Sequence, residues 1–170
     1  MASLNNHQKG AALIVSLLLL LVMTLLGISA VTTTTMEEKM AGNIRNKHVS
    51  FQAAETALRA GEQVAANLDP DTTFNGASGL YPRTEVGDTN YPIWMQTSGI
   101  NWQGVSGVKG VVQDPVYVVE DFSNAPRDKN CMLELPPPPG CMLPIYRVTA
   151  KGWGQNTNAE TMLQSTYKQL

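Results

Sequence analysis

Few side chains in this sequence are suited to chemistry, and two cysteines are the first candidates. Cys131 and Cys141 flank a segment that contains four consecutive prolines, residues 136–139. In the cytosol two such cysteines would usually stay free thiols, whereas in an exported domain the same pair is a candidate disulfide. The choice depends on where the domain resides, so the N-terminal segment has to decide it.

Candidates for catalysis or metal binding are sparse. His7 and His48 are the only histidines, and neither has a second ligand at a zinc spacing. They complete no Ser-His-Asp or Cys-His arrangement. Asp69-Pro70-Asp71 and Asn75-Gly76 offer oxygen ligands, but their spacing does not fit an EF-hand. We therefore expect no metal, no cofactor and no enzymatic activity.

The third chemical feature is a peptide bond. Lys9-Gly10 stands directly before the apolar run that starts at Ala11. Because glycine has no side chain and is easily extended, a protease can hold the backbone at this point. A short polar leader that ends in a basic residue and Gly, followed by an apolar helix, resembles the leader of type IV prepilins. In that family a membrane peptidase cuts after the Gly and methylates the new N-terminus, here Ala11.

The apolar run itself is long enough to cross a membrane. Residues 11–31 contain no charge, and about 20 such residues span the hydrocarbon core as a helix. The positive charges before it are Lys9 and the α-amino group, which favour a cytoplasmic N-terminus. The remainder of the chain is then expected outside the cytoplasm.

Three interpretations of this segment compete. A secretory signal peptide would be removed after the run, but Ile28-Ser29-Ala30 is a poor cleavage site and the run is too long. A plain single-pass anchor would keep the whole segment. A prepilin would lose residues 1–10 and keep the helix.

The helical pattern continues beyond the membrane segment. No proline precedes Pro70, and Asp69-Pro70-Asp71 is a stop signal. Apolar and small residues recur at helical steps, namely Met36, Met40, Ile44, Phe51, Ala54, Leu58, Gly61, Ala65 and Leu68. We predict a helix over 11–68, with residues 11–35 apolar and 36–69 amphipathic. Two helices with a break at Gly42 are the alternative.

Residues 70–170 are predicted to form a globular head. Residues 72–110 are rich in turn signals, and Trp94 and Trp102 are expected to fix them by packing. Strands are predicted at 116–120, 145–153 and 160–167, the last two joined as a hairpin. An antiparallel meander follows, with one face covered by the helix stripe from Phe51 to Leu68. The fold class is therefore α+β.

Charge excludes one class of function. The chain has 12 basic and 14 acidic residues, a net charge of −2. The basic residues form no run, so binding of nucleic acid through a broad cationic face is not expected.

The first third of the chain resembles one family. Gly10-Ala11-Ala12-Leu13, the stretch MEEKMAGN from Met36 and the stretch FQAAE from Phe51 are similar to the N-terminal region of PilX-family minor pilins of type IV pili. The closing segments YRVTAKGWG and LQSTYK also look like the final hairpin of that family.

The resemblance implies a pilin-like fold and a structural role. It implies cleavage after Gly10 by the prepilin peptidase, and contacts with other minor pilins and the major pilin through the N-terminal helix. A tip adhesin-like protein is a further implied partner, in a complex that primes assembly and supports adhesion and twitching motility. The implied location is the inner membrane with a periplasmic head, and then the pilus.

One residue departs from the wider pilin pattern. Pilins usually carry Glu at the fifth position of the mature chain, where this sequence has Val15. In major pilins that buried charge is thought to pair with the N-terminus of a neighbouring subunit, so its loss favours a place at or near the tip. A minor pseudopilin of type II secretion and an anchored periplasmic binding module are the alternatives.

Overall fold

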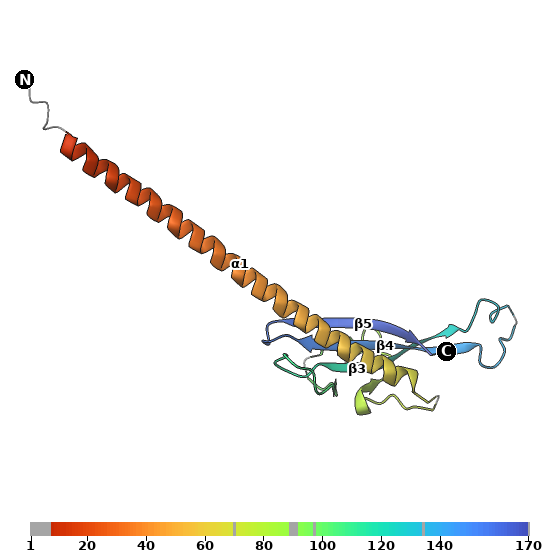
Figure 1. The fold of residues 1–170 in the computed structure, drawn as a ribbon. Coiled ribbons are helices and arrows are strands. Elements are labelled where there is room, and N and C mark those ends of the chain that lie inside the picture. Colours follow the sequence, from red (N-terminus) through yellow and green to blue (C-terminus); the bar gives the residue numbers. More distant parts are fainter. Residues whose placement is uncertain (1–7, 70, 89–91, 97, 134, 170) are drawn as a thin grey trace, which may run out of the picture. The chain divides into compact units, whose positions relative to one another are not determined.

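The computed structural model describes residues 8–69, 71–88, 92–96, 98–133 and 135–169. The chain divides into two compact units, Met1–Ile44 and Arg45–Leu170. One helix, α1 (Gln8–Ala66), contributes to both (Figure 1). The long helix is thus confirmed, and it ends two residues before the predicted Leu68. Gly42 does not interrupt it.

The second unit contains a small sheet (Figure 1). Its strands are β1 (Leu80–Tyr81), β2 (Gln103–Gly104), β3 (Val116–Pro126), β4 (Met142–Trp153) and β5 (Glu160–Lys168). Short 3₁₀ helices, η1 (Ala77–Gly79) and η2 (Ile93–Met95), lie in the segment before β2.

The strands follow the order β1-β3-β4-β5, and β2 also pairs with β3. The predicted meander is confirmed, since β3, β4 and β5 pair antiparallel in sequence order. The sheet is nevertheless mixed, because β1 pairs with β3 in parallel. β3 also runs to Pro126, beyond the predicted end at Glu120, after a register shift between Asp121 and Ser123.

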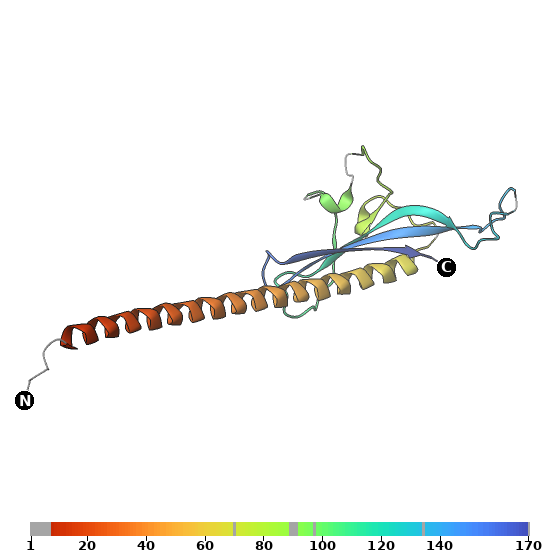
Figure 2. The same ribbon diagram turned by 90° about the horizontal axis from the view of Figure 1, so that it is seen from above.

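The part of α1 in this unit covers one face of the sheet (Figure 2). The buried helix residues are mainly small: Asn46, Ser50, Ala53, Ala54, Ala57, Gly61 and Ala65. Small side chains let the helix backbone come close to β4, where Gly152 lies against it. The prediction that Phe51 begins the buried stripe is wrong, because Phe51 is 46% exposed. Ala54, Leu58, Gly61, Ala65 and Leu68 do lie on the packed side.

The segment before β3 covers the opposite face of the sheet (Figure 2). Tyr81, Ile93 and Val118 form a buried cluster there, and Ile100 and Trp102 pack against it. The expected packing role of Trp102 is thus confirmed. Alternation along β3 explains the two cores, since Val118 faces this cluster while Val119 faces the helix side with Tyr146 and Val148.

Candidate functional site

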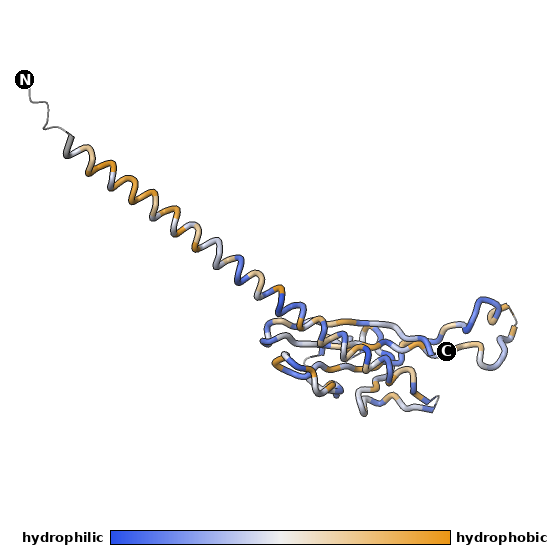
Figure 3. The backbone as a smooth tube through the Cα atoms, in the orientation of Figure 1, coloured by the Kyte–Doolittle hydropathy of each residue, from blue (hydrophilic) through white to orange (hydrophobic). Residues whose placement is uncertain are grey.

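The first half of α1 presents an apolar surface that the chain itself leaves open. An 18-residue window of this helix has a mean hydropathy of 2.9 and is 0% buried. It appears as the orange stretch in Figure 3. Among the described residues, α1 is the one helix long and apolar enough to cross a membrane. Because such a surface is unfavourable in water, it needs lipid or other apolar helices around it.

Six hydroxyl groups in and after this apolar surface, those of Ser16, Thr24 and the threonines at 32–35, are satisfied within the helix. Ser16 Oγ donates to the carbonyl of Leu13 at 2.9 Å, and Thr24 Oγ1 donates to that of Leu21 at 2.8 Å. The four threonines at 32–35 also donate to carbonyls three or four residues earlier. A hydroxyl that is already bonded costs little to remove from water. The segment can therefore enter an apolar environment despite these polar side chains.

The expected processing site lies in the first turns of α1. Gly10 is helical and exposed, and a Cβ built on it would meet no other atom within 4 Å. Residues 1–7 of the expected leader lie outside the described residues, and so does the side chain of Lys9. Ala11, the expected new N-terminus, is helical and exposed. Packing within the chain gives no reason for glycine at position 10.

Val15 lies on the same exposed surface. Its side chain is 57% exposed, between apolar neighbours such as Ile14 and Leu18. Position 15 is therefore uncharged and lies within a continuous apolar surface.

The two cysteines form a disulfide, as the exported-domain interpretation predicted. Cys131 and Cys141 are bonded, with Cα atoms 5.4 Å apart. They close the loop that connects β3 to β4. Asp128 shapes the start of this loop, since its Oδ1 accepts hydrogen bonds from the amides of Asn130 and Cys131 at 2.8 and 3.1 Å. Among the described residues no cysteine is free.

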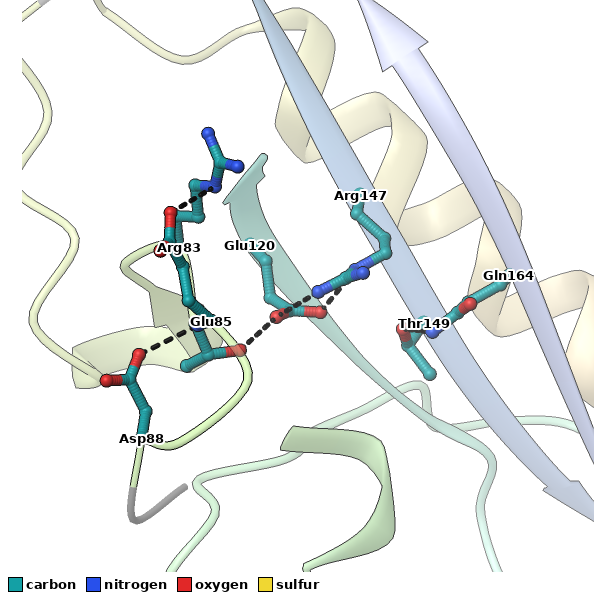
Figure 4. A network of polar contacts seen from close by, with 8 residues as sticks. Arg83, Glu85, Asp88, Glu120, Arg147, Thr149 and Gln164 are labelled. Atoms are coloured by element: carbon teal, nitrogen blue, oxygen red, sulfur yellow. Dashed lines mark hydrogen bonds and ion pairs between the residues drawn. The ribbon is translucent and has the colours of Figure 1, made fainter. Parts of the chain in front are cut away.

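A buried ion pair is the main feature that sequence reasoning missed. Arg147 donates from Nε and Nη2 to the two carboxylate oxygens of Glu120, at 2.8 and 2.7 Å (Figure 4). Glu120 is fully buried and the Arg147 side chain is 16% exposed, over the ring of Phe122. The available signal was an acidic residue that directly follows the apolar, mainly β-branched residues 116–119. Its partner depends on the β3–β4 register, which places Glu120 opposite Arg147.

A pocket of about 390 Å³ opens beside this pair. Its lining includes Arg83, Thr84, Glu85, Val86, Phe122 and Arg147. Arg83 pairs with Glu85 at 3.4 Å, and Arg147 pairs with Glu120. These charges therefore already compensate one another, so the pocket has no strong preference for an anion or a cation.

Two tyrosines on the helix side of the sheet have shifted pKa values. Burial raises the pKa of Tyr117, whose ring lies close to Gly61. Burial, and to a lesser degree the charge of Asp121, raises the pKa of Tyr146. Both effects disfavour the tyrosinate form, so they concern stability at high pH and give neither ring a role as a base at neutral pH.

The structure brings together no metal-binding group among the residues it describes. His48 is exposed on α1, and Asp69 and Asp71 are exposed after its end. His7 and Pro70 lie outside the described residues. The features with a defined geometry are thus the open apolar helix, Gly10 within it, and a head held by a disulfide and a buried ion pair.

Two family models match this chain and together cover most of it. The model described as PilX N-terminal matches residues 9–59. The model described as type IV pilus assembly protein PilX C-term matches residues 59–169. Among curated proteins and among solved structures, no match was found.

Proposed function

Because this chain belongs to the PilX family of type IV pilus assembly proteins, we propose that it is a minor pilin that helps to initiate pilus assembly. In this role it joins other minor pilins and a tip adhesin-like protein in a priming complex, to which the major pilin is added. The complex supports adhesion and twitching motility. Family membership establishes a structural pilus component, and the specific role within assembly is our proposal.

The observation that carries this proposal is the open apolar surface of α1. Residues 11–31 are uncharged, exposed and helical, and the hydroxyls of Ser16 and Thr24 are bonded within the helix. Such a surface suits two environments in turn, the inner membrane before assembly and a bundle of neighbouring pilin helices afterwards. The head, with its disulfide, fits the oxidising periplasm.

Gly10 supports processing by a prepilin peptidase. A glycine inside a helix costs about 1 kcal/mol relative to alanine, and nothing within 4 Å of Gly10 requires the absence of a side chain. We therefore attribute the glycine at position 10 to an external partner that needs an extended, unhindered backbone. Cleavage after Gly10 leaves Ala11 as the N-terminus, where methylation is proposed.

Val15 supports a position at or near the pilus tip. Without a carboxylate at this position, the subunit has no charge to pair with the N-terminus of a neighbouring subunit within the helix bundle. A subunit that is placed first has no earlier neighbour to pair with. Immunogold labelling of assembled fibres tests this point, because an even distribution along the fibre contradicts it.

The main experiment reads the N-terminus of the membrane-extracted protein by intact mass and N-terminal sequencing. We expect a chain that begins with N-methylated Ala11 only in cells that contain the prepilin peptidase. Gly10→Val should keep the leader in both strains. Gly42→Ala is the matched control, since its Cβ also meets nothing within 4 Å. A wild-type chain that keeps residues 1–10 with the peptidase present would leave the plain membrane anchor as the better account.

A further inference from the structure

The sheet ends in an open edge at β5. β5 is the last strand in the order β1-β3-β4-β5, and its nine residues pair with β4 on one side. Among the described residues, no strand pairs with its other side. Every second residue of this strand therefore directs an N–H and a C=O group outward. At Glu160 the carbonyl accepts a hydrogen bond from Lys47 Nζ. The outward backbone groups after it form an unpaired row that can template a further strand.

The middle of this edge, residues 161–167, carries none of the usual protections, and charged residues stand only at its two ends, Glu160 and Lys168. Residues 161–167 include no charge, no proline and no glycine, and the register with β4 is regular over all nine pairs. The opposite side of the sheet differs, since β1 and β2 have two residues each and Pro82 follows β1 directly. Natural edge strands are commonly blocked by charge, proline, a bulge or shortness. Residues 161–167 lack all four.

The open edge is also held rigidly. Ser50 Oγ and Thr161 Oγ1 are 2.6 Å apart, and Ser165 Oγ donates to Glu62 Oε1 at 2.6 Å. These contacts fix the start and the middle of β5 to α1. Because the edge is already ordered, adding a partner strand costs little conformational entropy on this side of the interface.

A small apolar pocket lies against the same strand. It is an open pocket of about 180 Å³, lined by Trp94, Met162, Leu163 and Gln164. Gln164 is held in place by its hydrogen bond to Thr149 Oγ1 at 2.9 Å. A strand added beside β5 would direct alternate side chains toward this face, and the lining of Trp94 and Met162 favours an apolar one.

We propose that the outer edge of β5 is a strand-addition site that receives an extended, uncharged segment of a different pilus subunit, with one apolar side chain of that segment in the Trp94 pocket. The backbone groups of the edge supply affinity and the pocket supplies selectivity, as in other cases of β-augmentation. The identity of the partner as a pilus subunit rests on the proposed function.

A second copy of this chain fits the edge less well. If two β5 strands paired antiparallel with full overlap, Thr166 of one copy would stand opposite Met162 of the other. The pocket would then face a short polar side chain and stay unfilled. A foreign segment with an apolar residue at this point fills it.

The test is site-specific photocrosslinking of the full chain in piliated cells. A compact diazirine amino acid replaces Met162, and in a control strain it replaces Val86, which is 85% exposed. We expect the probe at position 162 to give an adduct, and mass spectrometry should locate the crosslink in an extended segment of a different pilus subunit. The probe at position 86 should not give this adduct. No adduct at position 162, or an adduct with a second copy alone, would overturn the proposal.

An edge-blocking variant sharpens the test. Thr166→Lys places a charge on the exposed edge, and Thr73→Lys adds the same charge to an exposed residue elsewhere. With unchanged urea midpoints, we expect Thr166→Lys to cause about a tenfold loss of adduct, equivalent to a contact weaker by 1.4 kcal/mol, and Thr73→Lys to cause none. Equal adduct yields in the two variants would refute strand addition.

The N-terminus is sequenced from the same cells, which separates the two proposals. If the chain begins at Ala11 but the adduct is absent, the strand-addition proposal fails and the processing proposal stands. The specified adduct on a chain that keeps its leader supports strand addition and overturns the processing proposal.

Discussion

Gly152 of β4 lies directly against the backbone of α1 at Ser50, so closely that a Cβ on Gly152 would stand 2.6 Å from the Ser50 carbonyl oxygen. The obstacle is helix backbone and cannot be moved by a change of rotamer. The same contact explains why the buried helix residues are small. Helix and sheet thus meet through a glycine on one side and serine and alanine on the other.

Gly152→Ala should therefore destabilise the head strongly. An overpacked core usually loses 1–3 kcal/mol, and we expect about 3 kcal/mol because the backbone itself must shift. Gly104→Ala in β2 is the matched control, since its Cβ meets nothing within 4 Å. Urea unfolding of the detergent-solubilised chain, followed by tryptophan fluorescence, measures both. Equal midpoints for the two variants would contradict the close helix–sheet contact.

The buried pair of Glu120 and Arg147 gives a second prediction. Glu120→Gln removes a charge from a fully buried site, and breaking a buried pair in this way costs about 3 kcal/mol. We also compare the double variant Glu120→Met with Arg147→Leu against the single variants Glu120→Met and Arg147→Leu. The double variant should lose less free energy of unfolding than the two single variants together, because apolar residues then replace the whole pair. Glu55→Gln serves as the control, since the Glu55–Arg59 pair is exposed and should leave the urea midpoint unchanged. Additive losses would count against coupling of Glu120 and Arg147.

Removing the disulfide should weaken the fold by a moderate amount. For the short loop between Cys131 and Cys141, chain entropy gives a loss of roughly 2.8 kcal/mol in the double Cys→Ser variant. Reduction of the wild-type protein should lower the urea midpoint by the same amount, and limited proteolysis should then cut residues 127–141 first. If reduction left both the midpoint and the cleavage pattern unchanged, this bond would not contribute to stability.

High pH should unfold the head partly through Tyr117. Burial raises the pKa of this tyrosine in the folded state, whereas the unfolded value is near 10. Its contribution to stability is therefore complete below about pH 10 and is lost as pH rises through the folded pKa. Tyr117→Phe should make the fall in the free energy of unfolding less steep in this range. Unfolding midpoints measured at a series of alkaline pH values check this, and an unchanged slope would contradict it.

Local patterns in the sequence were sufficient for several elements. The uncharged run from Ala11 and the absence of proline before Pro70 predicted the long helix, because helix formation depends on nearby residues. Alternation along 145–153 predicted one strand, and the turn residues at 154–158 predicted its hairpin connection to the strand at 160–167. The cysteine pair became a disulfide candidate once the apolar segment indicated export.

Tertiary contacts alone decided the remaining features. Ser50 and Phe51 are neighbours on the helix, and apolar periodicity alone favours burial of Phe51. The close approach of Gly152 instead leaves room only for a small side chain, so Ser50 is buried and Phe51 is exposed. The pairing of Glu120 with Arg147 depends on a register between strands separated by a long loop. β1 has two residues and therefore no readable period. The sequence by itself determined the helix and the main strands, because these follow from local periodicity and composition. Only the tertiary structure decided the buried helix face, the ion pair and the open edge of β5, because these depend on which distant backbones lie side by side.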